Sequence, residues 1–201
     1  MLSIIAAYPI TSDEYTVLED KFGQLCHYQS WQLLKKNTRN NHTNEEDDIA
    51  QEMRLALIRS ACYYKRQVYI EKCFGCLGEY YVDPANPDLK TFVSTIEDDF
   101  TSSVVEELAN LWKNRTRHGA NRQKFGPHQE EMLFATVKKY VPKSERPDRT
   151  EPLILDSKFN TYCKAITWNA QKSIGKKITR EKSWRTGLVS LSEYDYLGGG
   201  F

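Results

Sequence analysis

The stretch that decides the fold lies between residues 158 and 182 and reads KFNTYCKAITWNAQKSIGKKITREK. At the helical spacing of about 100° per residue, its apolar side chains fall on one stripe, which predicts a helix with one buried face. The stripe consists of Phe159, Cys163, Ile166, Ala170 and Ile174. We expect Asp156 or Ser157 to cap the N-terminus of this helix.

The opposite face of the predicted helix is basic and aromatic. It carries Tyr162, Trp168, Asn169, Lys172 and Lys176. From Lys158 to Gly187 the chain has eight Lys or Arg residues and one acid, Glu181. Lysines neutralise phosphates and aromatic rings stack on unpaired bases, so this face is typical of nucleic-acid binding. The alternative is a solvated basic face whose tryptophan another segment covers.

The composition of the 201 residues, 40% of them hydrophobic, suits one domain or one domain with a large insertion. The net charge of +1 conceals a segregation of charge along the chain. Five acids and no cation lie between residues 44 and 52, namely Glu45, Glu46, Asp47, Asp48 and Glu52. Together with the basic end helix, this asymmetry predicts one protein-like partner and one polyanionic partner.

The N-terminal residues and the cysteines indicate the cellular compartment in which the protein is expected. Residues 1–10 are apolar but too short to span a membrane, and they lack the basic start of a signal peptide. Five cysteines, an odd number, favour reduced thiols in a cytoplasm, with no membrane contact. Cys73 and Cys76 form a Cys-x-x-Cys pair. A zinc site would need two further ligands from elsewhere, whereas core thiols explain the pair more simply.

Two helices are predicted in residues 1–64. The first begins at Ser12 or Asp13, ends near Lys36, and has Leu18, Phe22 and Leu25 on its inner stripe. Residues 37–44 form a polar loop, and the second helix runs from Glu46 to about Tyr64.

The second predicted helix has two apolar surfaces. Its inward stripe consists of Ile49, Met53, Ala56, Leu57 and Tyr64. Its outer side carries Leu55 and Ile58 beside Gln51, Glu52, Arg59 and Cys62. Apolar residues ringed by polar ones are typical of a protein-binding helix, although the middle segment of the same chain would cover them equally well.

Residues 48–59, DIAQEMRLALIR, resemble the D-hydrophobic-x-Q-E-x-x-x-x-L pattern of bacterial RNA polymerase sigma factors. In that family the pattern marks the helix of the second conserved region that docks on the polymerase. The next helix of the family has a Phe-x-x-aromatic-x-x-x-Ile-x-x-Asn pattern, which is similar to Phe159, Tyr162, Ile166 and Asn169 here. The resemblance implies a mainly α fold, with a helical core like sigma region 2 that is split by a helical insertion.

The chain departs from the family in two ways. Residues 65–157 separate the two halves, where the family has a short connection, and the chain ends soon after the second half, residues 158–187. We therefore expect no helix-turn-helix domain for the upstream promoter element. A sigma-like protein of this architecture resembles the late-transcription sigma factors of tailed phages, which act in the cytoplasm of the host cell.

The resemblance implies the partners and the role of each site residue, and it implies no cofactor and no catalysis. Multisubunit RNA polymerase would bind Asp48, Gln51, Glu52, Leu55 and Arg59. Promoter DNA with a −10-like element would be recognised and melted by Tyr162, Trp168, Asn169, Lys172, Lys176, Lys177 and Arg180.

The insertion is predicted to have its own helices, over residues 66–82, from Ile96 to about Thr116, and from Pro127 to about Val141. Residues 83–88 form a turn, and residues 115–124 form a basic connector, either a contact for nucleic acid or polymerase or a solvated loop. Pro142, Pro147 and Pro152 mark an extended return to the end helix.

Residues 188–201 are predicted to be a flexible tail ending in three glycines and Phe201. Phage late sigma factors end in a hydrophobic peptide that binds the DNA sliding clamp, and this tail resembles one loosely. Its clamp-binding residues would be Tyr194, Tyr196, Leu197 and Phe201. The alternative is a frayed terminus.

Two other classes of function stay open. A small metal-dependent nuclease or another nucleic-acid enzyme would use the acidic clusters at residues 45–48 and 97–99, which solvated helix starts explain more simply. A regulator that binds DNA without polymerase would use the basic helix alone.

Overall fold

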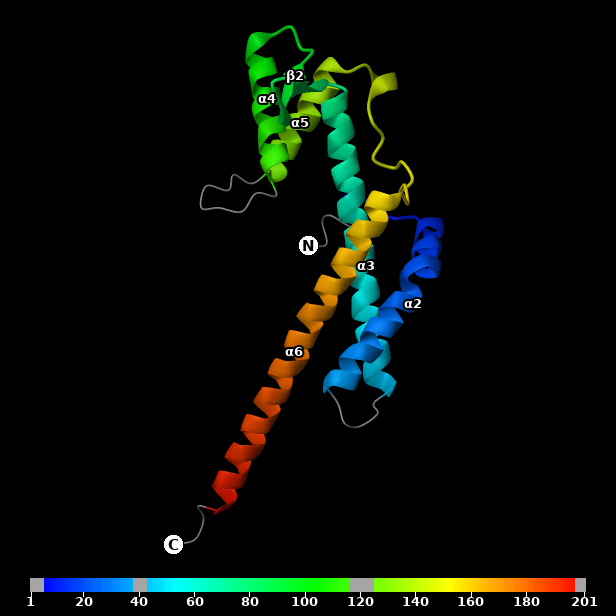
Figure 1. Ribbon diagram of the computed structural model, residues 1–201, viewed down its shortest axis with the longest axis vertical. Coiled ribbons are helices and arrows are strands. Elements are labelled where there is room, and N and C mark those ends of the chain that lie inside the picture. The colour runs from blue at the N-terminus through cyan, green and yellow to red at the C-terminus, as the bar shows by residue number, and fades with distance from the viewer. Residues whose placement is uncertain (1–5, 38–42, 116–124, 198–201) are drawn as a thin grey trace. The chain divides into compact units, whose positions relative to one another are not determined.

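The computed structural model describes residues 6–37, 43–115 and 125–197, with side chains for residues 6–35, 47–115 and 125–180. The chain is mainly helical, which confirms the predicted class (Figure 1). The elements in order are α2 (Ser12–Asn37), α3 (Thr43–Gly75), β1 (Gly78–Asp83), β2 (Asn86–Ser94), α4 (Asp99–Asn114), α5 (Pro127–Tyr140), a 3₁₀ turn (Lys143–Glu145) and α6 (Ser157–Leu197).

The chain divides into two compact units. Unit 1 comprises Met1–Tyr64 and Pro152–Phe201, and unit 2 comprises Lys65–Glu151. The first boundary between the units lies between residues 64 and 65, where the sequence predicts that the insertion starts. The second lies between residues 151 and 152, whereas the sequence predicts that the insertion ends at residue 157. Unit 1 therefore contains both segments that resemble sigma factors, residues 48–59 and 158–180.

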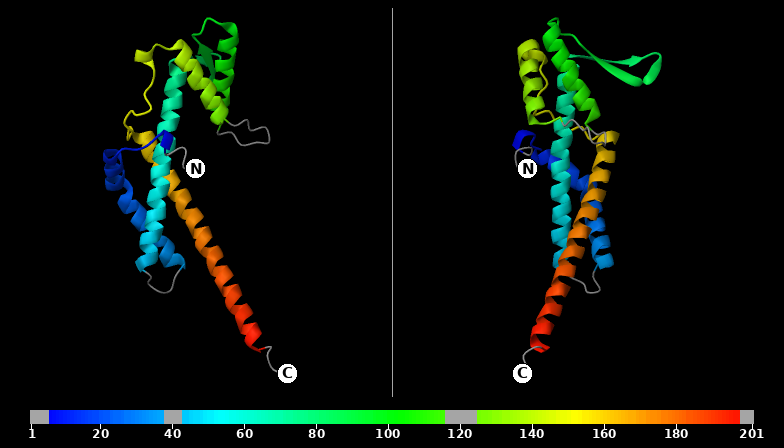
Figure 2. Two further views of the ribbon diagram at one scale, coloured as in Figure 1. Left: turned by 180° about the vertical axis from the view of Figure 1, so that it is seen from behind. Right: turned by 90° about the vertical axis from the view of Figure 1, so that its left-hand side faces the viewer.

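Unit 1 is built from α2, the first part of α3, and α6. The helices α2 and α3 are antiparallel, and α6 runs in the direction of α2 (Figures 1 and 2). Their shared core consists of Cys26, Leu33, Ile49, Met53 and Ile174. A second group of contacts lies nearer the start of α6, where the Phe159 ring packs edge-on against Tyr64 at 5.1 Å and Phe22 at 6.3 Å. Ile174 of α6 therefore shares a buried cluster with Ile49 and Met53 of α3, so the apolar stripes of the two helices meet there.

The buried side of α6 differs from the predicted stripe. Phe159, Cys163 and Ile174 are buried as expected, but Thr167 and Gln171 are buried in place of Ile166 and Ala170, which are half-buried. The amide Nε2 of Gln171 donates a hydrogen bond of 3.2 Å to the main-chain carbonyl of Gln29 on α2. A polar side chain is stable in this position because its partner on α2 satisfies it.

Three helix boundaries differ from the prediction. Helix α3 continues past Tyr64 to Gly75, because residues 65–74 contain neither glycine nor proline. Helix α6 continues to Leu197, so residues 188–197 are not a flexible tail; Gly187 lowers helix propensity by only about 1 kcal/mol, and no proline interrupts the helix. Of the predicted loop at residues 37–44, both ends are helical and residues 38–42 lie outside the described residues.

Unit 2 is not purely helical. Of the helix predicted over residues 66–82, residues 66–75 are helical as the end of α3, but residues 78–82 belong to β1. Strands β1 and β2 form an antiparallel hairpin in which Gly78 faces Ser94 and Tyr80 faces Phe92. A Cβ at Gly78 would overlap the carbonyl oxygen of Val93, so only glycine fits where the hairpin begins. The aromatic and β-branched run that follows Gly78 favours a strand. Of the turn predicted at residues 83–88, only residues 84 and 85 form the turn, because Asp83 ends β1 and residues 86–88 belong to β2.

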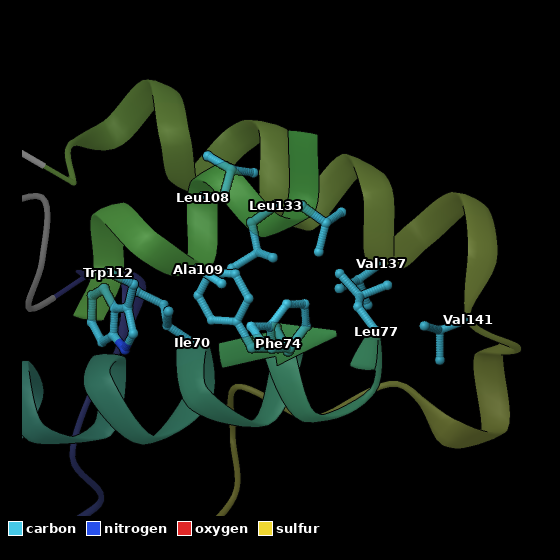
Figure 3. Packing of buried hydrophobic residues seen from close by; sticks show 12 residues of the cluster. Ile70, Phe74, Leu77, Leu108, Ala109, Trp112, Leu133, Val137 and Val141 are labelled. Carbon is cyan, nitrogen blue, oxygen red and sulfur yellow. The ribbon is translucent and has the colours of Figure 1, made fainter. Parts of the chain in front are cut away.

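The core of unit 2 lies between the end of α3, the hairpin, α4 and α5 (Figure 3). Its buried members include Phe74, Phe92, Trp112, Leu133 and Val137. The Phe74 ring lies edge-on to Phe92 at 5.9 Å, which joins α3 to the hairpin. The predicted helices at residues 96–116 and 127–141 correspond to α4 and α5, and residues 116–124 of the basic connector lie outside the described residues.

Candidate nucleic-acid interface

One face of α3 is solvent-exposed over three turns and carries all five predicted polymerase-binding residues. These are Asp48, Gln51, Glu52, Leu55 and Arg59. The Leu55 side chain is 50% exposed, whereas Met53 and Leu57 on the other side of the helix are buried. An exposed leucine among polar side chains is available for a partner. Cys62, expected on this face, is instead fully buried.

The start of α6 is fixed by its N-cap, Asp156, which the sequence predicts. The carboxylate Oδ1 of Asp156 accepts a 2.7 Å hydrogen bond from the Phe159 amide. The Tyr64 hydroxyl donates to the same carboxylate oxygen at 3.3 Å. This cap therefore ties the first turn of α6 to α3, and it sets the rotation at which α6 presents its outer face.

Tyr162 and Trp168 do not share one face of α6. Tyr162 is half-buried and its ring lies 5.6 Å from that of Tyr64 on α3. Burial raises the pKa of Tyr162, and the neighbouring Cys163 and Tyr63 add to this rise. Trp168 follows six residues later, about 120° around the helix, and is 52% exposed. The two rings cannot hold one base between them from these positions.

The remaining predicted DNA-binding residues form an exposed basic surface on α6. These are Trp168, Asn169, Lys172, Lys176, Lys177 and Arg180. The ammonium group of Lys172 lies 5.2 Å from the centre of the Trp168 ring, a cation–π contact. Residues 158–180 contain no acid, so the positive potential of this surface is not neutralised within the segment.

The two candidate surfaces meet at one ion pair. Lys177 on α6 donates a 3.0 Å hydrogen bond to the Glu52 carboxylate on α3. The side chains are 61% and 46% exposed, so water screens the pair strongly and it stabilises the fold by at most about 1 kcal/mol. Its importance is geometric, because it places the basic end of the α6 surface beside the Gln-Glu motif of α3.

An exposed aromatic group on α2 lies outside the inner stripe that the sequence predicts for this helix. Tyr28 and Trp31 are 55% and 46% exposed, and their rings stack at 6.2 Å with an interplanar angle of 26°. The ammonium group of Lys35 lies 4.9 Å from the Trp31 ring. The available signal was the spacing, since Trp31 and Lys35 repeat the Trp-x-x-x-Lys arrangement of Trp168 and Lys172.

Structural roles explain two further groups that the sequence offered as metal ligands, the acids near residue 98 and the Cys-x-x-Cys pair. Asp98 caps α4 by accepting a hydrogen bond from the Thr101 amide at 3.2 Å, and its bond from the Thr101 hydroxyl lowers its pKa. Cys73 is buried in the core of unit 2, where burial raises its pKa to about 12. In the described part of the chain, no three His, Cys, Asp or Glu side chains are grouped to hold a metal ion.

The residues predicted to bind a sliding clamp lie at the end of the chain. Tyr194, Tyr196 and Leu197 belong to the last turn of α6 by their backbone, and Phe201 lies outside the described residues. Among residues 6–37, 43–115 and 125–197, no helix combines the length and the apolar composition needed to cross a bilayer. No protein-family model, no curated protein and no solved structure matches the chain.

Proposed function

We propose that the protein is a sigma-like transcription initiation factor that binds multisubunit RNA polymerase and melts a −10-like promoter element. One observation carries the proposal. Two segments that resemble consecutive sigma-factor helices, residues 48–59 and 158–180, are far apart in the sequence but belong to the same compact unit. The intervening Lys65–Glu151 forms a separate unit. An insertion of this kind leaves a two-helix site intact.

Polymerase binding is assigned to the exposed face of α3. Leu55 would be the apolar anchor, with Gln51, Glu52 and Arg59 as polar contacts around it. Anchors of this kind dominate interface energies because they leave water entirely on binding, while the polar rim sets the register. In this proposal, residues 65–151 contribute nothing to the polymerase contact on α3.

Promoter opening is assigned to the exposed face of α6. A duplex hides the faces of its bases, so a protein that captures a base as it unstacks shifts the equilibrium toward the open form. Trp168 would take one such base, and a base–aromatic stack contributes about 1–3 kcal/mol. Lys172, Lys176 and Arg180 would hold backbone phosphates, and Asn169 would contact a base edge. The Tyr162 ring is assigned to the support of α6 on Tyr64 rather than to this stack.

The Glu52–Lys177 pair supports an arrangement in which polymerase and DNA are bound at adjoining surfaces. DNA held on α6 would then enter the polymerase at the contact made by α3. The proposal requires no cofactor and places the protein in a cytoplasm, that of the host cell if a phage encodes it. A clamp contact through the C-terminal residues remains an expectation from the resemblance.

A reconstituted transcription reaction tests this function. Core RNA polymerase is incubated with fragmented genomic DNA, with and without the protein, and the 5′ ends of the transcripts are mapped. The proposal predicts new initiation sites that share an A·T-rich element about one helical turn upstream, and that disappear with Leu55→Asp. A protein that leaves initiation unchanged and instead cleaves the DNA when Mg²⁺ is added would be an enzyme, and the proposal would be wrong.

A further inference from the structure

The exposed aromatic pair on α2 lies beside the contact between α2 and α6. The Tyr28 hydroxyl accepts a 2.7 Å hydrogen bond from the Gln32 amide, and the Gln32 carbonyl oxygen is 3.4 Å from the donating amide of Gln171 on α6. The same Gln171 amide donates to the Gln29 carbonyl at 3.2 Å. A continuous set of side-chain contacts therefore links the Tyr28–Trp31 stack to the residue next to Lys172.

Trp168 lies on the edge of α6 that faces α2. A Cβ added at Gly175 would be 3.1 Å from the Leu33 side chain, so α2 packs closely on this edge of α6. Trp168 precedes Gly175 by seven residues, which is two turns, and so projects along the same edge. The helices α2 and α6 run in the same direction (Figures 1 and 2), and Gln171 contacts Gln29. Trp168 therefore lies within about one turn of the level of Tyr28, since it precedes Gln171 by three residues and Tyr28 precedes Gln29 by one.

The two helices present the same pair of groups to solvent. Trp31 has Lys35 over its ring at 4.9 Å, and Trp168 has Lys172 over its ring at 5.2 Å. The four side chains are exposed. Neither segment contains an acid, from Lys21 to Asn37 on α2 or from Lys158 to Arg180 on α6. A surface that repeats an aromatic ring with its own cation, on two helix segments without acids, has the charge and chemistry of a polyanion site with stacking groups.

We infer that Tyr28, Trp31 and Lys35 form a second stacking site for single-stranded DNA, which continues the site of Trp168 and Lys172 across the contact between α2 and α6. The inference deepens the proposed function and rests on it for the role of Trp168. It assigns to α2 a nucleic-acid contact that the resemblance to sigma factors does not assign to these residues. The unpaired strand would cross from one helix to the other and place bases on both tryptophan rings.

The ligand is a single strand rather than a duplex because stacking needs an unpaired base face, which a duplex does not offer. In each pair the lysine covers the ring in the free protein. Stacking of a base on an exposed ring is stronger than an exposed cation–π contact, so a base displaces the ammonium group, which is then free to hold the neighbouring phosphate. An acidic protein would be attracted by the same charge but has no unpaired base to stack on the two rings, and it is the competing outcome of the test.

The test measures the dissociation constant of the full-length protein for a labelled single strand of about ten nucleotides, and for the corresponding blunt duplex, at one salt concentration. The variants are Trp31→Ala, Trp31→Phe and Trp168→Ala, each shown to be folded by circular dichroism. Tyr81→Ala is the matched control, since Tyr81 is as exposed as Tyr28 but lies on the hairpin of unit 2.

Trp31→Ala should weaken single-strand binding by about fivefold to a hundredfold, the range spanned by one base–aromatic stack. Trp31→Phe should retain most of the affinity, and duplex binding should change little in either variant. Unchanged single-strand binding by Trp31→Ala, alongside a loss with Trp168→Ala, would overturn the α2 site and leave the proposed promoter function standing. If Trp31→Ala and Trp168→Ala both weaken single-strand binding, but the wild-type protein does not bind polymerase, the single-strand site would be supported and the proposed function overturned.

Two further outcomes would also overturn the α2 site. Equal losses on single-stranded and duplex DNA would make Trp31 a general contact rather than a stacking group. Loss of polymerase capture by Trp31→Ala, with single-strand affinity unchanged, would identify this face of α2 as a protein-docking surface.

Discussion

Lys177 on α6 and Glu52 on α3 form an ion pair of 3.0 Å, although 124 residues lie between them in the sequence. Each belongs to one of the two segments that resemble sigma-factor helices. Both side chains are substantially exposed, so the pair is weak and a partner can displace it. The proposed contacts of Glu52 with polymerase and of Lys177 with a phosphate would therefore break this pair at little energetic cost.

A charge swap separates the role of Glu52 in this pair from its role toward polymerase. Combining Glu52→Lys with Lys177→Glu restores an attractive pair, so the free energy of unfolding should stay within about 1 kcal/mol of the wild type, measured by urea denaturation. Polymerase affinity should nevertheless remain low, because the carboxylate that we propose as a polymerase contact is absent. Full recovery of polymerase binding in the double variant would show that Glu52 acts only through Lys177.

Trp168→Ala should impair transcription from a duplex promoter far more than from a template already melted across the same region. Melting in advance removes the unstacking that the aromatic contact offsets, which is about 1–3 kcal/mol for one base. Trp168→Phe should recover much of the duplex activity. Equal losses on the two templates would mean that the tryptophan has a structural role and that the surface of α6 is only basic.

Lys176→Ala should weaken binding to both templates alike, because a phosphate contact carries no information about base pairing. Removing one phosphate contact should also lower the slope of log affinity against log salt by about one. Lys143→Ala serves as a control, since Lys143 is also exposed but belongs to unit 2. An unchanged slope for Lys176→Ala, or an equal reduction for Lys143→Ala, would remove Lys176 from the DNA-binding surface.

Two buried thiols of unit 1 predict how stability depends on pH. Burial raises the pKa of Cys26 to about 11, with the nearby Glu19 carboxylate adding to the rise, and burial raises that of Cys163 to about 12. An unfolded thiol has a pKa of about 9, so above this pH the unfolded chain loses thiol protons that the folded chain keeps. The contribution of these thiols is therefore fully present below pH 9, and it falls as the pH rises from 9 toward 11.

Urea denaturation under reducing conditions at pH 8, 9 and 10 measures this dependence. Other groups also titrate in this range, so the comparison is with the Cys26→Ala, Cys163→Ala double variant. Its stability should be lower overall because two cavities are created, but it should decline less steeply with pH. The same slope in both proteins would show that the two thiols ionise alike in the folded and unfolded chains.

The helices of unit 1 were predictable because their periodicity is local, and Leu18, Phe22, Met53 and Phe159 all lie buried where the spacing places them. The rotation of α6 was not fully predictable. An apolar pattern favours Ile166 over Thr167 on the buried side, and the choice was reversed by contacts with α2 that involve Gln171. Such contacts depend on which helix lies alongside, and periodicity within one segment contains no information about that.

Residues 78–82 form a strand rather than the end of a helix, because their aromatic and β-branched side chains favour extended backbone. Gly78 and the run Tyr80, Tyr81 and Val82 are the sequence features that indicate this strand, and the predicted turn at residues 83–88 strengthens the indication. The exposed aromatic residues on the outer face of α2 were not predictable for a different reason. Trp31 and Tyr28 are exposed, and exposed aromatic residues stand out only after the buried side of a helix is known.

The central claim is that α3 docks on multisubunit RNA polymerase, and the affinity of the purified protein for the core enzyme tests it most directly. We expect the wild type to bind with a submicromolar dissociation constant. The affinity should fall at least tenfold with Leu55→Asp, or with Gln51→Ala and Glu52→Ala together. It should not change with the control Glu107→Ala, an exposed residue of unit 2. These exposed substitutions should each alter the free energy of unfolding by no more than about 0.5 kcal/mol. A wild-type protein that does not bind the core enzyme, or a folded Leu55→Asp variant that binds as tightly as the wild type, would contradict the claim.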